Sequence, residues 1–121
     1  MIAKVNLEDA LAGFAEPWSP RIVGDVNDVH IQVVKALGEF VWHRHERDAE
    51  AFIVLKGSLR VRFRDCDIDL GPGELLVIPP DVEHMPVSDH GCELILLEPA
   101  STRNTGNVEN DRTVHEPRRL G

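Results

Sequence analysis

The chain has 121 residues, of which 42% are hydrophobic, and it carries 13 lysine and arginine residues against 21 aspartate and glutamate residues. This length is typical of one domain with its own core, so we expect residues 1–121 to form a single domain. The formal net charge of -8 disfavours a nucleic-acid partner, and no apolar run is long enough for a membrane-spanning helix.

The amino-terminal segment predicts a short helix instead of an export signal. Glu8 and Asp9 interrupt the apolar stretch that a secretory signal requires, and acidic residues of this kind are typical of the first turn of a helix. We therefore expect a peripheral helix at about residues 6–15. The two cysteines, Cys66 and Cys92, lack the close spacing of a redox or zinc pair, so their thiols are expected to be reduced in a cytoplasmic protein.

From Arg21 onward, short apolar runs alternate with glycine, proline and aspartate at the spacing of an all-β sandwich or barrel. The pattern predicts strands at residues 21–26, 29–37, 39–45, 50–55, 58–64, 67–70, 75–78, 84–87 and 93–98. Turn residues predict hairpins at Lys56-Gly57, Asp65-Cys66-Asp67 and Gly71-Pro72-Gly73. After Pro99 the sequence becomes polar and turn-like, which predicts an extended carboxy-terminal arm at about residues 99–121.

Three of the predicted strands are apolar at every position, namely residues 51–55, 75–78 and 94–97. An antiparallel strand with one solvated face alternates apolar and polar residues, so both faces of these strands are expected to be covered. The cover is either another part of this chain or a second subunit. A homodimer would supply it through one self-complementary patch.

Histidine and glutamate residues in the middle of the chain follow the spacing of metal ligands. His43 and His45 lie two residues apart, so in a strand both side chains point to the same face. Glu50 follows after a turn at the correct parity to reach the same cavity, and His84 comes later in the chain. Imidazole and carboxylate ligands suit Fe, Mn, Ni, Co or Zn, and the lack of nearby thiolates argues against a closed structural zinc site.

The segments around these residues resemble the two motifs of the cupin family. The first, GEFVWHRHERDAEAFIVLKG at residues 38–57, contains two histidines, a glutamate and a hairpin glycine in the order of the first cupin motif. The second, GELLVIPPDVEH at residues 73–84, resembles the second cupin motif, which ends in the third histidine. Elsewhere the chain, including Glu98-Pro99 and Asn104-Thr105-Gly106, is similar to cupins described as mannose-6-phosphate isomerase-like.

The resemblance implies a double-stranded β-helix, or jelly-roll barrel, that is frequently dimeric and holds a metal ion in its interior. Its core would span about residues 38–98, and the implied metal ligands are His43, His45, Glu50 and His84. Three features depart from the motif. Gly38 precedes His43 by one residue fewer than is usual, which matters little if Gly38 only relieves a turn. Asp81 stands where glycine is usual, although aspartate tolerates a left-handed turn, and Ser88 replaces an asparagine.

Two classes of function fit these residues. The first is a metal-dependent small-molecule enzyme with isomerase or dioxygenase chemistry on a sugar, an enediol or a keto acid. The second is a non-catalytic module that binds or senses a small ligand, with a structural or adventitious metal. No spacing ties a catalytic base to the site, so Glu46, Glu83 and Glu93 are only loose candidates for that role.

A row of arginines, Arg60, Arg62 and Arg64, alternates with apolar residues along one predicted strand. The row is interpreted as a solvated outer face. The alternative is that one arginine binds an anionic substrate at the mouth of the barrel.

Overall fold

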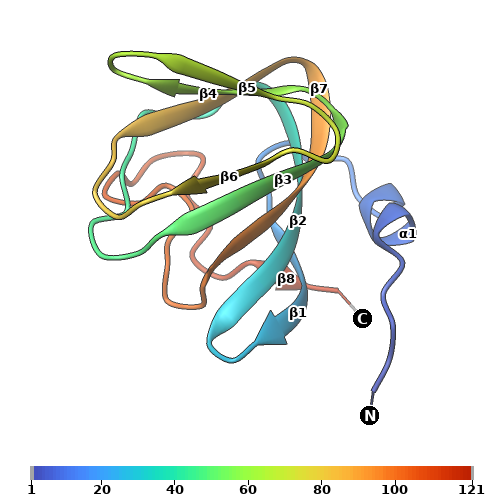
Figure 1. Cartoon of the computed structure of the whole chain (residues 1–121). Helices are drawn as coiled ribbons and strands as arrows, with labels where there is room; N and C mark the ends of the chain where they lie inside the picture. Colours follow the sequence, from blue (N-terminus) through green and yellow to red (C-terminus); the bar gives the residue numbers. More distant parts are fainter. Residues whose placement is uncertain (1, 121) are drawn as a thin grey trace.

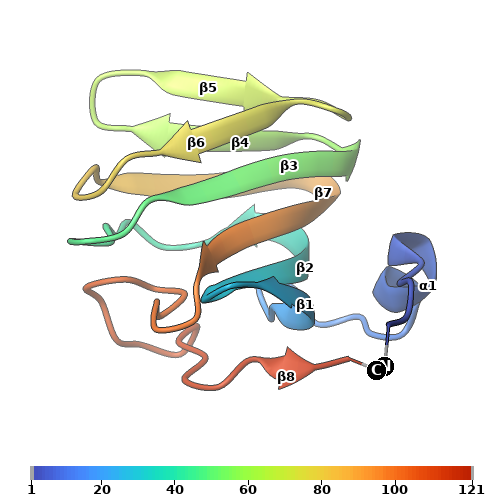
Figure 2. The same cartoon turned by 60° about the horizontal axis from the view of Figure 1, so that its bottom comes forward.

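The structure, a computed structural model, describes residues 2–120, which form one short helix and eight strands. The elements are α1 (Leu7–Ala12), β1 (Arg21–Val26), β2 (Val29–Glu39), β3 (Glu50–Gly57), β4 (Leu59–Phe63), β5 (Asp67–Leu70), β6 (Leu75–Ile78), β7 (His84–Pro99) and β8 (Arg118–Arg119). The strands curl around a common interior, and α1 lies to one side of them (Figures 1 and 2). The all-β jelly-roll prediction is confirmed, although the sheet is not closed into a full barrel.

The long strand β7 organises the fold because its partner changes along its length. Its first residues pair with β4, as in Phe63 with His84, and its later residues pair with β3, as in Ala51 with Leu97. On its other edge, β2 runs antiparallel to most of β7. The two predicted strands at 84–87 and 93–98 are therefore one continuous strand.

Other local predictions are corrected by these long-range pairings. Residues 39–45 do not form a strand beyond the end of β2, and within that segment His43 makes an isolated bridge to His84. Lys56-Gly57 does not form a hairpin, because β3 pairs with β6 and β7 while β4 pairs with β5 and β7. Gly71-Pro72-Gly73 turns between β5 and β6, which do not pair with each other. The hairpin predicted at Asp65-Cys66-Asp67 is confirmed between β4 and β5.

The helix α1 is shorter than the predicted range. The Asn6 side chain caps it by accepting a hydrogen bond from the backbone amide of Asp9 at 2.9 Å, and Gly13 ends it. Leu11 is buried where the helix meets the sheet. With six residues, α1 is far too short to cross a bilayer, and the described residues contain no other α-helix.

Inward-facing side chains give the interior an apolar part and a polar part. The main apolar cluster consists of Trp18, Val34, Ala36, Phe52, Val54, Leu59, Val61, Leu70, Ile78, Cys92, Leu94 and Leu96. The polar part contains Gln32, His43, His45, Glu50, His84 and Glu98, all of which are buried. The same strands supply both parts.

The outer face of β6 stays open within the described chain. Leu75 is 55% exposed and Val77 is 54% exposed, although both belong to a strand that is apolar at every position. The alternative in which the chain covers this face by itself is therefore wrong for β6.

The departures from the cupin motif at Asp81 and Ser88 are accommodated locally. Asp81 has a φ of 66°, so aspartate adopts the left-handed conformation predicted for this position. Ser88 is buried, and its hydroxyl donates to the carbonyl of Ser58 at 2.8 Å and accepts from the amide of Gly91 at 3.1 Å.

Candidate metal centre

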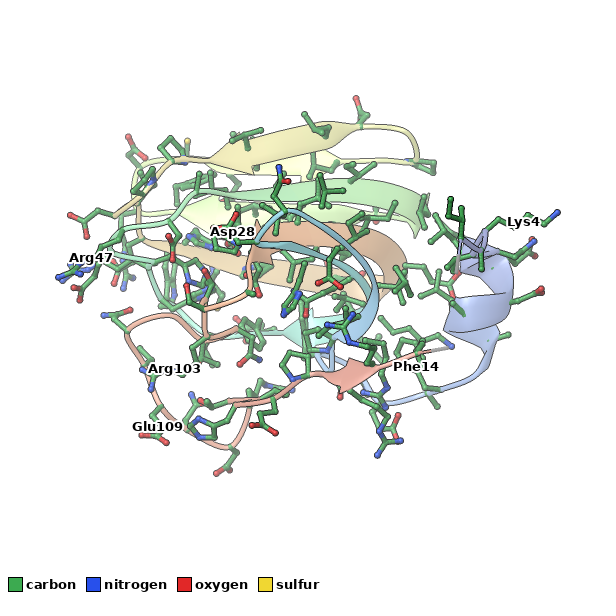
Figure 3. All side chains as sticks on the ribbon, turned by 90° about the horizontal axis from the view of Figure 1, so that it is seen from below. Lys4, Phe14, Asp28, Arg47, Arg103 and Glu109 are labelled. Atoms are coloured by element: carbon green, nitrogen blue, oxygen red, sulfur yellow. The ribbon has the colours of Figure 1, made fainter. Side chains whose placement is uncertain are left out.

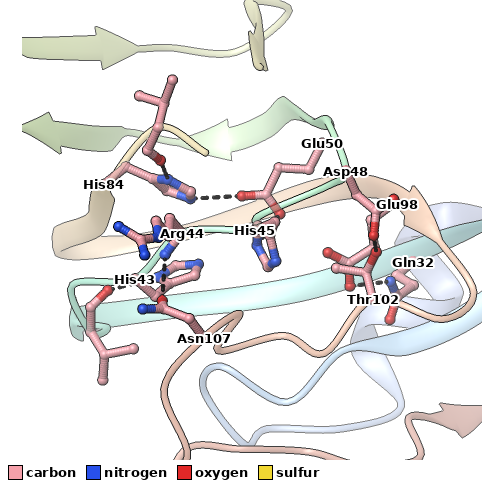
Figure 4. A network of polar contacts seen from close by, with 12 residues as sticks. Gln32, His43, Arg44, His45, Asp48, Glu50, His84, Glu98, Thr102 and Asn107 are labelled. Atoms are coloured by element: carbon pink, nitrogen blue, oxygen red, sulfur yellow. Dashed lines mark hydrogen bonds and ion pairs between the residues drawn. The ribbon is translucent and has the colours of Figure 1, made fainter. Parts of the chain in front are cut away.

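Three separate parts of the chain bring the four predicted ligands together inside the barrel. His43 and His45 lie in the connection between β2 and β3, Glu50 begins β3, and His84 begins β7. Each offers one ligand atom, and these atoms all lie within 4.8 Å of one another. All four residues are buried, with exposed fractions between 0% and 6%, and Figure 4 shows them facing a common point.

A backbone bridge aligns two of the histidines. The amide of His43 donates to the carbonyl of His84 at 3.0 Å, and the amide of His84 donates to the carbonyl of His43 at 2.9 Å. The ring Nδ1 atoms face the carbonyl oxygens of Val41 and Val82 at 2.9 and 2.8 Å. These carbonyls accept from the Nδ1 hydrogen, which leaves each Nε2 free to coordinate a metal ion.

Glu50 supplies the negative charge of the cluster. Its Oε1 lies 2.7 Å from Nε2 of His84, and its Oε2 lies 3.1 Å from Nε2 of His45. Burial opposes ionisation of this carboxyl group, but the contacts with His45 and His84 outweigh it and hold the pKa of Glu50 well below its usual range. A permanent carboxylate therefore faces the imidazole rings.

His43 is held in the neutral form that coordinates metals. Burial lowers its pKa to about 4, and the neighbouring His84 contributes to that decrease. At neutral pH the His43 ring is therefore uncharged, so a metal ion does not have to displace a proton from its Nε2 atom.

The cluster fits a divalent metal ion. Nε2 of His45 is buried and lies 3.1 Å from Oε2 of Glu50 as an ion-pair contact, but it makes no hydrogen bond of good geometry among the described residues, which costs free energy unless another group satisfies it. At His84, Nδ1 already donates to Val82, so in the neutral ring Nε2 is an acceptor that lies 2.7 Å from the Glu50 carboxylate, and two acceptors this close favour a cation at the site. A set of three imidazoles and one carboxylate is typical of sites for first-row divalent metals.

Two spaces adjoin the cluster. A cavity of about 40 Å³ contacts His43 and Glu50 and is otherwise mainly apolar, being lined also by Trp18, Pro20, Val34, Phe40, Phe52, Leu59, Pro86, Leu94, Leu96 and Asn104. An open depression of about 400 Å³ lies beside His45 at the barrel mouth. It is lined also by Glu46, Arg47, Asp48, Ser101, Thr102, Arg103, Gly106 and Asn107. Arg47 and Arg103 lie toward the same end of the molecule in Figure 3.

The carboxy-terminal arm contacts the ligand segment directly. Asn107 makes two hydrogen bonds to the backbone of Arg44, one through its side chain at 2.9 Å and one through its amide at 3.0 Å. Gly106 packs so closely that a Cβ added there would overlap the Arg44 carbonyl and lie 3.1 Å from the His43 ring. Asn104 lines the cavity and also anchors the arm, because its side chain bonds to the backbone of residues 112 and 114.

Sequence reasoning assigned no role at the site to a second buried polar pair beside Glu50. Gln32 is 1% exposed and Glu98 is 3% exposed, and Nε2 of Gln32 donates to Oε1 of Glu98 at 3.1 Å. Burial, followed by the charge of Glu50, raises the pKa of Glu98 well above its usual range. Strand parity carries a signal for this residue, because Glu98 shares the inward parity of Leu94 and Leu96.

The remaining candidate residues lie outside the cluster. Arg60, Arg62 and Arg64 are each about half exposed and pair with Asp69, Asp67 and Glu83 respectively, so the row is the solvated face that the sequence predicts. Glu83 is committed to that surface pair, and Glu93 lies 4.0 Å from Lys35. Among the three loose candidates for a catalytic base, Glu46 lines the depression beside His45.

Comparisons with known proteins agree with this fold. A crystal structure of a cupin-2 domain containing protein from Shewanella frigidimarina NCIMB 400 is 43% identical, with a TM-score of 0.78, over 78% of this chain and 93% of that one. Protein NMB1881 from Neisseria meningitidis is 33% identical, with a TM-score of 0.74, over 80% of this chain and 99% of that one.

A shorter match exists to a curated relative, protein YdbB of Bacillus subtilis (strain 168), which is 35% identical over 63 residues. That match covers 51% of this chain and 56% of YdbB, so it spans about half of the relative. The family model described as "Cupin domain" matches residues 30–98, which is more than half of the sequence. The chain therefore belongs to the cupin family.

Proposed function

We propose that His43, His45, Glu50 and His84 bind one divalent transition metal ion, and that the protein is a metal-dependent enzyme acting on a small molecule. The observation that carries the proposal is the convergence of four buried ligand atoms within 4.8 Å, one of which is a buried nitrogen without a hydrogen-bond partner. The metal is one of Fe, Mn, Ni, Co or Zn.

The arrangement supports chemistry on a sugar, an enediol or a keto acid. When bound, the metal would supply Lewis-acid chemistry for an isomerase or O2 chemistry for a dioxygenase. Glu50 offsets part of the metal charge, while the carbonyls of Val41 and Val82 fix the orientation of the His43 and His84 rings. The largely apolar cavity limits access of bulk water, and the depression beside His45 provides an entrance for the substrate. The mannose-6-phosphate isomerase-like subtype stays a prediction.

Element-resolved analysis of protein purified without chelator tests the proposal. Near-stoichiometric metal is expected in the wild type, with loss in His43→Ala and in His84→Ala. His115→Ala is the matched control, because His115 is exposed and pairs with Glu109 away from the cluster. A wild type that stays empty after addition of Fe, Mn, Ni, Co and Zn would contradict the metal site, as would equal metal loss in the control.

A second candidate is a ligand-binding or sensing module with a structural metal. The near-complete burial of all four ligands favours it, because closed structural sites exclude solvent in the same way. Proton relaxation of the Mn²⁺-loaded protein separates the two candidates. Exchangeable water on the ion supports the enzyme, and its absence supports the module.

We also propose that the protein is a homodimer in the cytoplasm with no nucleic-acid partner. The exposed apolar residues Leu75 and Val77 on β6 support a self-complementary interface, and the net charge of -8 disfavours nucleic acid. Light scattering is expected to give twice the chain mass for the wild type and the monomer mass for Leu75→Lys/Val77→Lys. A monomeric wild type would contradict the dimer.

A further inference from the structure

The buried pair formed by Gln32 and Glu98 keeps two oxygen atoms without a partner. Oε1 of Gln32 and Oε2 of Glu98 are both buried, and neither has a hydrogen-bond partner in residues 2–120. Apart from Nε2 of His45, which the metal would satisfy, these are the buried side-chain atoms without a partner in that range. Such atoms are uncommon in folded proteins because each loses its bonds to water without compensation.

The pair lies beside the metal cluster. Ala51 pairs with Leu97 between the antiparallel strands β3 and β7. Glu50, the residue before Ala51, therefore stands opposite Glu98, the residue after Leu97. Both side chains are buried, and Figure 4 shows them in the same network of polar residues. A group bound by Gln32 and Glu98 would therefore be adjacent to a group bound at the metal.

Two residues that line the depression at the barrel mouth lie close to this pair. Asp48 and Thr102 line the depression and are joined by a hydrogen bond of 2.8 Å from the Thr102 hydroxyl to the Asp48 carboxylate. The charge of Asp48 contributes to the raised pKa of Glu98, and Figure 4 shows Asp48 and Glu98 on the same side of the cluster. Asp48 therefore connects the depression with the surroundings of Glu98.

The chemistry of the pair selects its ligand. The amide oxygen of Gln32 is an acceptor at any pH, so the group facing it must carry a hydrogen atom on oxygen or nitrogen. A carboxylate or a phosphate dianion has no such hydrogen. A cationic ammonium group would be repelled by the nearby divalent ion. A neutral hydroxyl group carries the required hydrogen, which it can donate to the Gln32 oxygen, and it bears no positive charge.

We propose that Gln32 and Glu98 form a subsite for one hydroxyl group of the substrate, next to the metal-binding position. The proposal rests on the proposed metal-dependent function and narrows it, because it makes the substrate a hydroxy compound such as a sugar or a hydroxy acid. An ordered water molecule has the same hydrogen-bonding chemistry, so the experiment must separate the two sources.

Binding of two simple probes to the Co²⁺-loaded protein tests the subsite. Glycolate and acetate are small carboxylates that differ by one hydroxyl group, and their binding is followed by the Co²⁺ absorption spectrum. The wild type is expected to bind glycolate at least tenfold more tightly than acetate. In Gln32→Met/Glu98→Met the preference should fall below threefold, while Co²⁺ affinity stays within threefold of the wild type.

Two further variants keep the test decisive. Gln32→Met alone retains one polar partner and should lower the preference about fivefold, which provides a readout if the double variant does not fold. Ser88→Ala removes a buried hydroxyl that bonds to Ser58, and it should leave the preference unchanged. Equal binding of glycolate and acetate to the wild type would overturn the subsite. A preference that survives in the double variant would also overturn it, because the metal alone would then produce the preference.

Failure of the metal proposal is recognised separately. If the wild type binds no Co²⁺ and none of the other metals, the proposed function fails, and the subsite is tested by a crystal structure of the protein soaked with glycolate. A glycolate hydroxyl within hydrogen-bond distance of Gln32 Oε1 and Glu98 Oε2 would support it. An empty pair, or a water molecule that glycolate does not displace, would overturn it.

Discussion

The polar and apolar parts of the interior are equally buried but are built on different principles. On β3, Glu50 and Val54 share one face and are 4% and 0% exposed. On β2, Gln32 and Val34 also share one face and are 1% and 4% exposed. The apolar part is stable through packing alone. The polar part needs a partner for each atom, and several of those partners are not supplied by the described chain. Position along a strand therefore separates residues that stabilise the fold from residues that we propose to bind metal or substrate.

The largest effect is expected in the apolar part. Leu59 is 1% exposed, so Leu59→Ala should lower the free energy of unfolding by about 2–5 kcal/mol through lost burial and the cavity left behind. Denaturant unfolding measures this loss. Metal stoichiometry of the folded fraction should not change, and a variant that folds normally but loses its metal would break the separation between the two parts.

In the polar part, Glu50→Gln should weaken Mn²⁺ binding by about 100-fold or more, because the neutral amide cannot offset the charge of the cation. Equilibrium dialysis measures the affinity. Glu46→Gln is the matched control, since Glu46 is exposed and lies outside the cluster, and it should change the affinity less than threefold. Comparable losses in the two variants would contradict the assignment of Glu50 as a ligand.

Substitutions at two glycines with positive φ test whether the carboxy-terminal arm positions the proposed metal ligands. Gly106→Ala should lower stability by about 1–3 kcal/mol and also weaken metal binding, because the new Cβ would displace Arg44 and press on the His43 ring. Gly73→Ala has a similarly left-handed backbone but open space around the added Cβ, so it should cost about 1 kcal/mol without changing metal affinity. Thermal unfolding and metal titration of both variants check the difference. Equal metal affinities in the two variants would show that the arm does not position the ligands.

The smallest effect is expected for Glu98→Gln. This substitution should change how the free energy of unfolding of the metal-free protein depends on pH. The pKa of Glu98 is raised in the folded state, so between the unfolded and folded pKa values the folded protein binds more protons. Wild-type stability therefore falls as the pH rises through this window, and glutamine removes that contribution. Glu98→Gln should gain stability relative to the wild type as the pH increases from 4.5 toward 8. Parallel stability curves would contradict a raised pKa.

The sequence predicted the fold and the metal-binding candidates because both depend on local patterns. The motif spacing identified His43, His45, Glu50 and His84, and the tolerance of aspartate for left-handed backbone predicted the conformation of Asp81. The assignment of these four residues as ligands stays a prediction until a metal is measured.

Long-range pairing explains what the sequence did not reveal. Lys56-Gly57 has the composition of a hairpin turn, but β7 pairs with both β3 and β4 and keeps them apart. Gln32 and Glu98 are 66 positions apart and lie in separate apolar runs, so their contact depends on the register of β2 against β7. The approach of Gly106 to His43 is likewise a tertiary contact without a local signature.

The backbone bridge between His43 and His84 also affects the unfolding of the chain. These two residues enclose β3, β4, β5 and β6, and their amides and carbonyls already bond to each other. A metal ion held by both rings would close this loop in the manner of a reversible cross-link, restricting the chain entropy of the partly unfolded state. Release of the ion and opening of these four strands would then be coupled events. Amide hydrogen exchange in β3–β6 would therefore slow on metal loading more than exchange in β1.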